Sequence, residues 1–245
     1  MNRTLHIVLT SMGLTLLSAY LIWALFVLPD DQPLTECKEL KIEIADSVSR
    51  RFITSREVKR LLADSDLSIV GMEYGEISTQ QVENIVEKSA VVRSAECYKL
   101  QDGTVCLLVE QRMPHLRVIT AEGNYYIDSD RRRMRATSHT ASYVPVVTGR
   151  VTERMAKEEL FDFVSWLNGN SFWDAQIEQI NVTPTKEIEL IPRIGSHTIL
   201  LGSLDDYEQK LHKLQLFYTE GLSKIGWKDY TEIDLRYKHQ VIGRR

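Results

Sequence analysis

The sequence predicts an α+β protein in which a single N-terminal transmembrane helix precedes two folded regions. Three observations lead to this prediction: an uncharged apolar stretch over residues 4–29, a strand–helix–helix–strand–strand pattern over residues 37–112, and a strand-rich pattern with two helices over residues 113–245. The composition is that of a globular protein, with 43% hydrophobic and 26% charged residues, so extensive disorder is not expected.

Residues 5–28 are the predicted membrane anchor. They contain no Asp, Glu, Lys or Arg, and a helix needs about 20 apolar residues to cross the hydrocarbon layer. Arg3 precedes the stretch and two aspartates follow it, so the positive-inside rule predicts a cytoplasmic tail of residues 1–4 and export of the remainder. A cleaved signal peptide is the alternative, but the apolar run is longer than a signal-peptide core and no small-residue cleavage site follows it.

The first folded region is predicted over residues 37–112, after a polar linker at 29–36. Local signals place each of its elements, because capping boxes mark helix starts and Asp-Gly marks a tight hairpin. In order, we predict a strand at 40–44, a helix opened by Thr54 and Glu57, a helix opened by Ser78 and Gln81, and strands at 91–100 and 105–111 around Asp102-Gly103.

The second folded region is predicted over residues 113–245 and is richer in strands. Its pattern alternates short apolar runs with turn residues, and only two stretches have helical periodicity. In order, we predict a hairpin at 116–119 and 125–128, an extended segment at 143–147, a helix at 153–167 capped by Thr152, strands at 177–182, 187–191 and 198–201, a helix capped by Ser203, and a long strand over 230–242.

The three cysteines, at positions 37, 97 and 106, form no C-x-x-C pair, so neither a zinc site nor a thioredoxin-like motif is expected. Cys97 and Cys106 flank the predicted hairpin. A disulfide between them is one alternative, but diagonal cross-strand positions are usually too far apart, which favours packing as free thiols.

The sequence contains no G-x-S-x-G, no H-E-x-x-H, no Walker glycine loop and no G-x-G-x-x-G motif. The six histidines are scattered, and the carboxylate pairs lie at predicted helix starts, where they suit the helix dipole. We therefore predict no catalytic residue, metal, cofactor or small-molecule substrate. The net charge of −4 gives no reason to expect nucleic acid as a partner.

The basic run Arg131–Arg135 is the sharpest local charge feature. A solvated hairpin arm is the interpretation that we favour. Contact with anionic lipid or cell-wall polymer is the alternative, and nucleic acid is disfavoured because the predicted compartment is wrong and the rest of the chain is not basic.

Several motifs, taken together and in order, resemble the FtsQ/DivIB family of bacterial division proteins, and the region after the anchor resembles a POTRA domain. The motifs resemble that family's V-x-E-R-x-P, hairpin, LPvltG, v-LG and vDLRY signatures, and they are Val109-x-Gln111-Arg112-x-Pro114, Tyr126-Ile127-Asp128, Val144–Gly149, Leu201-Gly202 and Ile233–Tyr237. The chain departs from the pattern at Gln111, where the family has an acid, and at Ser129–Arg131, which lacks the usual turn glycine.

The resemblance implies a non-enzymatic divisome scaffold in the inner membrane at the division septum, with its bulk in the periplasm. It implies partners of the FtsB/FtsL coiled-coil type and a link to the septal peptidoglycan synthase. It also places the family's key partner-binding tyrosine at Tyr237.

The residues themselves also indicate the final strand as the partner-binding element. A terminal strand often lies at a sheet edge, where its unpaired backbone groups can accept an incoming strand. Strand alternation puts Leu235 and Tyr237 on one face and Arg236 and Lys238 on the other. The predicted partner-binding residues are Tyr237, Arg236, Leu235, Lys238, His239, Gln240 and Tyr230. The alternatives are that Tyr237 belongs to the core and that Arg236 forms a structural ion pair.

Two other functions remain as alternatives. A POTRA-bearing chaperone or secretion component would normally carry several such domains or a barrel. A membrane-anchored cell-wall enzyme would need acid and base groups that converge in a cleft.

Overall fold

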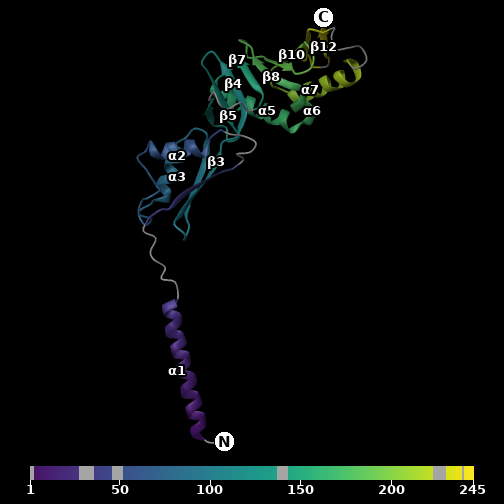
Figure 1. Ribbon diagram of the computed structural model, residues 1–245. Coiled ribbons are helices and arrows are strands. Elements are labelled where there is room, and N and C mark those ends of the chain that lie inside the picture. The colour runs from purple at the N-terminus through teal and green to yellow at the C-terminus, as the bar shows by residue number, and fades with distance from the viewer. Residues whose placement is uncertain (1–2, 28–35, 46–51, 137–142, 223–229, 239) are drawn as a thin grey trace.

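The computed structural model describes residues 3–27, 36–45, 52–136, 143–222, 230–238 and 240–245. Figure 1 shows a long N-terminal helix, α1 (Arg3–Val27), a smaller unit that follows it, and a larger unit that contains the C-terminus. The helix predicted over residues 5–28 is thus confirmed as a helix. Among the residues just listed, however, no helix combines the length and the hydropathy that crossing a membrane requires. The membrane anchor therefore stays a prediction from the sequence.

The smaller unit is a three-stranded sheet with two helices on one face. Strand β1 runs parallel to β3, and β2 runs antiparallel to β3 on its other side. The elements, in chain order as predicted, are β1 (Glu39–Ile44), α2 (Ser55–Ala63), α3 (Thr79–Glu87), β2 (Val92–Lys99) and β3 (Thr104–Gln111).

Local signals determine both helix starts in this unit. Thr54 and Glu57 form a complete capping box: the Thr54 hydroxyl accepts from the Glu57 N–H, and the Glu57 carboxylate accepts from the Thr54 N–H at 2.8 Å. Ser78 caps α3 by accepting from the Gln81 N–H. Val58 and Val82, on the apolar faces of the two helices, are fully buried against the sheet.

The cysteines are free and buried, and the strand register explains why Cys97 and Cys106 do not pair. Cys97 lies opposite Leu107, whereas Cys106 lies opposite Tyr98. Neighbouring residues of a strand point to opposite faces, so the two thiols lie on opposite faces of the sheet. Burial, followed by the nearby Glu83 carboxylate, raises the pKa of the Cys97 thiol to about 11, which keeps it protonated and unreactive.

The larger unit is built on one mixed sheet. Within the described residues its strand order is β12-β11-β10-β9-β8-β7-β4-β5-β6, with β4, β7 and β8 mutually parallel, β10 parallel to β11, and the other pairs antiparallel. The strands before the last hairpin are β4 (Pro114–Thr120), β5 (Gly123–Asp128), β6 (Arg133–Arg135), β7 (Val146–Gly149), β8 (Ile177–Val182), β9 (Ile188–Pro192) and β10 (Thr198–Gly202). The helices are α4 (Glu153–Lys157), α5 (Glu159–Gly169), α6 (Ser171–Gln176), α7 (Tyr207–Leu216) and the π-helix η1 (Phe217–Leu222).

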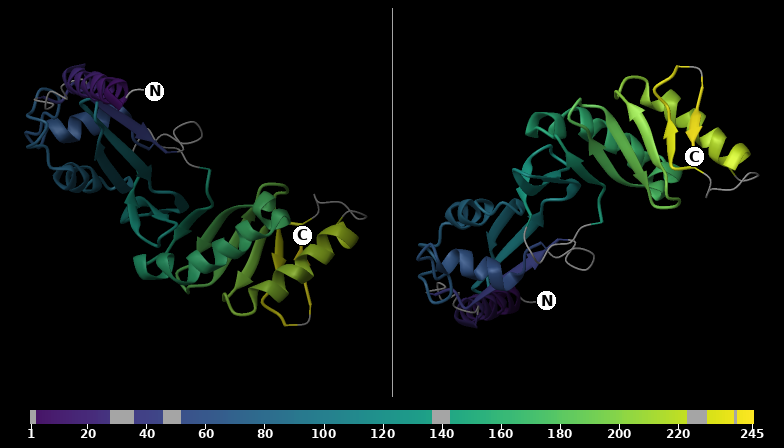
Figure 2. Two further views of the ribbon diagram at one scale, coloured as in Figure 1. Left: turned by 90° about the horizontal axis from the view of Figure 1, so that it is seen from below. Right: turned by 90° about the horizontal axis from the view of Figure 1, so that it is seen from above.

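These helices cover one face of the sheet and leave the other face open (Figure 2). The buried residues Phe163, Trp173 and Leu211 come from α5, α6 and α7, and they join one apolar core with Ile199 and Ile233 of the sheet. The core thus extends as far as the C-terminal strands, which fixes their position relative to the helices.

Two local predictions for the larger unit were wrong, and two of its elements were not predicted. The helix predicted over 153–167 is interrupted at Glu158, whose φ and ψ are −108° and −92°. The carbonyl of Lys157 instead accepts from Arg131 Nη1 at 2.9 Å, a contact made across the fold. Ser203 does not cap the last helix. That helix begins after Asp206, whose own backbone is left-handed, with a φ of 53°. Helix α6 and strand β6 were not predicted.

The two units share residues at their junction. Tyr126 and Met134, from β5 and β6, are fully buried in the core of the smaller unit rather than in that of the larger one. Arg112, directly after β3, donates to the buried Asp128 at 2.8 Å. The other Asp128 oxygen accepts from the backbone N–H groups of Asp130 and Arg132. Arg131 adopts a left-handed φ of 60° in this turn, a conformation that glycine adopts more readily.

Candidate partner-binding site

The C-terminal segment is a hairpin at the end of the large sheet, not one long strand. Strand β11 (Glu232–Asp234) pairs in parallel with β10, and β12 (Ile242–Arg244) pairs antiparallel with β11. The prediction of a single edge strand over 230–242 was therefore wrong. In the sequence, positions 236–240 do not alternate apolar with polar side chains, which interrupts the strand pattern. The described residues 236–238 and 240 form the hairpin tip between β11 and β12. The end strand of the sheet is β12.

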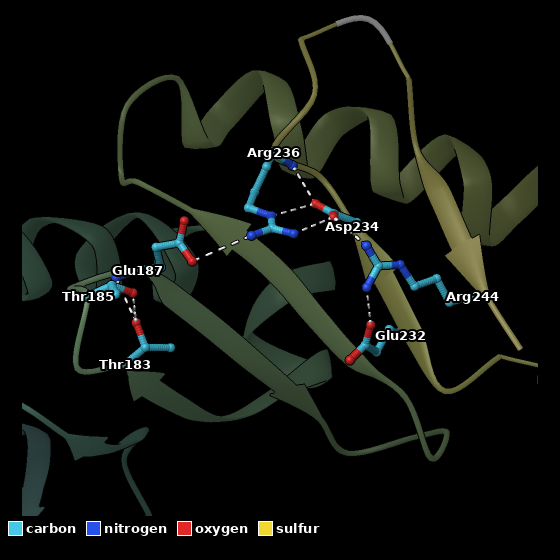
Figure 3. Close-up of polar contacts among 7 residues, drawn as sticks. All are labelled: Thr183, Thr185, Glu187, Glu232, Asp234, Arg236 and Arg244. Carbon is cyan, nitrogen blue, oxygen red and sulfur yellow. Dashed lines mark hydrogen bonds and ion pairs between the residues drawn. The ribbon is translucent and has the colours of Figure 1, made fainter.

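Arg236 and Asp234 form the central ion pair of this region (Figure 3). Arg236 Nε donates to Asp234 Oδ1 at 2.9 Å and Nη2 donates to Oδ2 at 2.7 Å, in a two-point contact. The Asp234 side chain is 0% exposed. Hydrogen bonds from Arg236 lower the pKa of the Asp234 carboxyl, and the same contact raises the pKa of Arg236. The fork of Arg236 is thus already occupied within the chain.

The Arg236 contact extends to the turn between β8 and β9. Arg236 Nη1 lies 3.5 Å from Glu187 Oε2. Glu187 is itself positioned by the turn, since its backbone N–H donates to the Thr183 hydroxyl at 3.0 Å (Figure 3). The guanidinium therefore links the segment after β11 to the turn before β9, which is the structural alternative that the sequence offered for Arg236.

The predicted partner-binding residues differ in exposure. Leu235 is fully buried in the core and follows the end of β11, so the predicted strand alternation does not place it on one face with Tyr237. Tyr237 is 46% exposed at the hairpin tip. Lys238 and Gln240 are exposed beside it. His239 lies outside the described residues. Among the described residues, the exposed members of the predicted set are thus Tyr237, Arg236, Lys238 and Gln240.

Tyr230 is half-buried and supports β12 from beneath. Its ring packs edge-on against Phe217, with 6.0 Å between centroids. A Cβ atom at Gly243 would lie 2.5 Å from Tyr230 Cε1, so glycine is required where the strand crosses this ring. Tyr230 therefore positions the end strand rather than forming an exposed contact.

Three residues that the sequence did not point to help to hold the hairpin. Lys213 of α7 donates to the carbonyl of Lys238 at 2.8 Å and approaches that of Tyr237 at 3.4 Å. Arg244 of β12 donates to Glu232 of β11 at 3.0 Å. The apolar Val241-Ile242 after the polar residues at 238–240 was the available signal for a second short strand. Nothing local indicated Lys213, because its partners lie far along the chain.

The basic run Arg131–Arg135 is less free than a solvated arm. Arg131 pairs with Asp162 and lies over the Phe161 ring at 4.2 Å. Arg133 pairs with Glu153 at 3.0 Å and lies over the Tyr125 ring at 4.2 Å. These two guanidinium groups therefore fasten β6 and its turn to the rest of the larger unit.

A crevice of about 830 Å³ opens where the carboxyl ends of β4, β7 and β8 meet, and Glu122, Glu153 and Glu189 contribute to its lining. Hydrogen bonds from Lys157 and Arg133 lower the pKa of Glu153, which is the opposite of what a general acid needs. Glu189 accepts from Asn181 at 2.8 Å. Among the described residues, no group of three or more His, Cys, Asp or Glu side chains is arranged to hold a metal ion. This crevice does not support the enzyme alternative.

The arrangement can present backbone hydrogen-bonding groups to another chain. Strand β12 has a strand neighbour on one side only within the described part of the sheet, and Tyr237 is exposed at the tip of the same hairpin. An incoming strand could pair with β12 while a side chain packs on Tyr237.

Comparison with known families agrees with this organisation. A family model described as FtsQ/DivIB, C-terminal related, matches residues 113–244, and a model described as a POTRA-like domain matches residues 35–110. A search of curated proteins finds no match to the chain.

Proposed function

The chain belongs to the FtsQ/DivIB family, and we propose from this membership that it is a non-enzymatic scaffold of the bacterial divisome. In this role it binds FtsB/FtsL-type coiled-coil partners on the outer side of the inner membrane and links them to septal peptidoglycan synthesis. The observation that carries the proposal is the match over residues 113–244, because that region ends in the hairpin described above.

The proposed mechanism is addition of a partner strand to β12. The sequence alone pointed to a strand over residues 230–242 as the edge, and the hairpin moves the expected contact to Ile242–Arg244. Main-chain hydrogen bonds would supply affinity, and exposed side chains near the strand would supply specificity. Tyr237 is the anchor that we expect to matter most, because a large, half-exposed aromatic residue adds rigid contact area at little entropic cost.

A binding experiment with the full chain and a purified FtsB/FtsL-type pair tests this mechanism. We expect Tyr237→Ala to weaken binding by about tenfold or more, as hot-spot aromatic residues do. Tyr143→Ala is the matched control, since Tyr143 is also exposed but lies far along the chain from the hairpin. Unchanged binding by Tyr237→Ala would contradict the proposed contact. Arg236 is left intact here, because its pair with Asp234 makes it a structural residue.

We also propose that residues 5–28 anchor the chain in the inner membrane, with residues 1–4 in the cytoplasm and the remainder in the periplasm. The support is the absence of Asp, Glu, Lys and Arg from residues 4–29 and the charge asymmetry around them. Retention in membranes after alkaline extraction, together with protease digestion from the periplasmic side, tests this topology. Release by alkaline extraction would contradict it.

Depletion of the protein tests the cellular role. A divisome scaffold predicts that depleted cells grow into filaments without septa and that a fluorescent fusion gathers at the division site. Normal division after depletion would favour the chaperone or secretion alternative.

A further inference from the structure

The two edges of the smaller sheet differ in whether their outward-facing backbone groups are hydrogen-bonded to side chains. Strand β2 lies at one edge, and helix α3 covers its outward-facing N–H groups. Glu87 accepts from the Ala95 N–H at 3.1 Å, and Glu83 accepts from the Cys97 N–H at 2.8 Å. A further strand would have to displace both carboxylates, so the β2 edge is closed to strand addition.

Strand β1 forms the opposite edge, and within the described residues no strand lies beyond it. The chain just before β1 is paired further, at Glu36 and Cys37, with residues 71–73. It has six residues, whereas the end strands of the large sheet, β6 and β12, have three each. The Ala45 N–H donates to Val109 of β3. Backbone groups of alternate residues face opposite sides of a strand, so those of Leu40, Ile42 and Ile44 face the open edge.

The side chains of β1 alternate strictly. Glu39, Lys41 and Glu43 are exposed on the face away from the helices, and Leu40, Ile42 and Ile44 are only half-buried on the helix-covered face. Their incomplete burial leaves apolar surface next to the open edge. Lys41 pairs with Glu43 of its own strand at 2.7 Å, so both charges point to the same side.

This pattern is self-complementary in one antiparallel register. When Ile42 lies opposite Ile42 of a second copy, Leu40 lies opposite Ile44, and Lys41 lies opposite Glu43. In this register the hydrogen-bonded pairs are formed by Leu40, Ile42 and Ile44, the residues whose backbone N–H and C=O groups point to the open edge. The Lys41 and Glu43 pairs fall at the non-hydrogen-bonded positions, where side chains approach most closely. A register centred on Lys41 would instead oppose Lys41 to Lys41 and Glu39 to Glu43.

We propose that the open β1 edge is a self-association surface, on which a second copy of this chain pairs antiparallel about Ile42 to give one continuous sheet. Opposite charges at the two Lys41–Glu43 positions select this partner and register, and a strand with other charges in those places is disfavoured. The helices of both copies then lie on the same face of the joined sheet. This inference is independent of the proposed function, since β12 lies in the other sheet.

Sedimentation of the full chain in mild detergent, over a dilution series, tests the proposal. We expect the native chain to show a monomer–dimer equilibrium. Lys41→Glu places like charges opposite each other twice, and it should weaken association by roughly tenfold or more. The double variant Lys41→Glu/Glu43→Lys restores opposite charges in the same register and should recover native association. A native chain that stays monomeric throughout the series would overturn the proposal.

A mixing experiment makes the test specific. Lys41→Glu leaves two acids at these positions and Glu43→Lys leaves two lysines, so each variant alone should be largely monomeric while their mixture associates. Lys59→Glu, an exposed change on α2, is the control for a general charge effect and should associate like the native chain. Tyr237→Ala should also associate normally, which separates this surface from the partner site. Equal association of Lys41→Glu and the native chain, or failure of the double variant to recover, would contradict the register.

Discussion

The side chain of Arg236 lies directly against the backbone of Gly202, so closely that a Cβ atom at position 202 would lie 2.7 Å from Arg236 Cγ. Gly202 has a φ of +75°, a conformation that favours glycine. The turn at the end of β10 thus leaves room for the arginine that neutralises the buried Asp234 carboxylate. The Leu201-Gly202 and Asp234–Arg236 motifs are far apart in the sequence. In the structure they contact each other through Gly202 and Arg236.

Gly202→Ala tests this contact. The methyl group would meet Arg236 and the residue would be held at positive φ, so we expect the free energy of unfolding to fall by about 1–3 kcal/mol. Urea unfolding followed by tryptophan fluorescence measures the loss, because Trp173 is buried in the same core. Gly75→Ala is the control, since nothing lies within 4 Å of a Cβ atom there. Equal stability of the two variants would contradict the argument.

Asp234→Asn removes the charge from the buried partner. We expect a loss of about 2 kcal/mol at neutral pH, the usual value for hydrogen bonds to a charged group. Arg236 lowers the pKa of Asp234 in the folded chain, so this stabilisation is present above the unfolded pKa and is lost as the pH falls below about 4. The difference in unfolding free energy between the native chain and the variant should therefore shrink in acid. The exposed Glu232→Gln should cost less than about 1 kcal/mol at neutral pH.

Gln111→Glu tests the departure from the family's acid. The Gln111 amide donates to the Ala45 carbonyl at 3.0 Å and accepts from Phe52 and Ile53 N–H groups at 2.8 and 3.1 Å. A carboxylate can accept but not donate, so it would leave the Ala45 carbonyl facing a negative charge. Repulsion between the carboxylate and the Ala45 carbonyl should destabilise the segment that Gln111 holds, so we expect faster hydrogen exchange at the Phe52 and Ile53 amides at neutral pH.

Two comparisons make the Gln111→Glu result decisive. Recovery of amide protection near pH 4 is expected, because a protonated carboxyl can donate again. Glu110→Gln, on the exposed face of the same strand, should leave the exchange of both amides unchanged. Native protection in Gln111→Glu at neutral pH would show that the donated hydrogen bond is dispensable.

His197→Gln tests the buried pair between β10 and η1. His197 Nε2 lies 2.6 Å from the Tyr218 hydroxyl, and burial lowers the pKa of His197. A lowered folded pKa means that stability is fully present above the unfolded pKa of about 6.5 and declines as the pH falls below it. We expect the native chain to lose stability between pH 7.5 and pH 5, and the variant to lose less. Burial also lowers the pKa of His115, which therefore contributes to the pH profiles of the native chain and of the variant alike. Parallel profiles of the two proteins would contradict a role for His197 titration.

The elements of the smaller unit could be predicted because their signals are local. The capping box of Thr54 and Glu57, the turn at Asp102-Gly103 and the alternation of β1 each involve residues close together in sequence. The same was true of most strands in the larger unit. The errors fell where groups distant in sequence meet, as at the end of α4, where the Lys157 carbonyl accepts from Arg131.

The sequence by itself determined the order of strands and helices, the apolar N-terminal helix and the resemblance to a division-protein family. Only the tertiary structure decided which strands form the edges. Alternation tells which side chains share a face, but it does not tell which strand lies beside another. Ile233 lies beside Ile199, and Thr231 donates to the Arg244 carbonyl, through backbone bonds that no side-chain pattern encodes. Those bonds place β12 at one end of the large sheet. In the smaller sheet, backbone pairing with β3 places β1 at an edge.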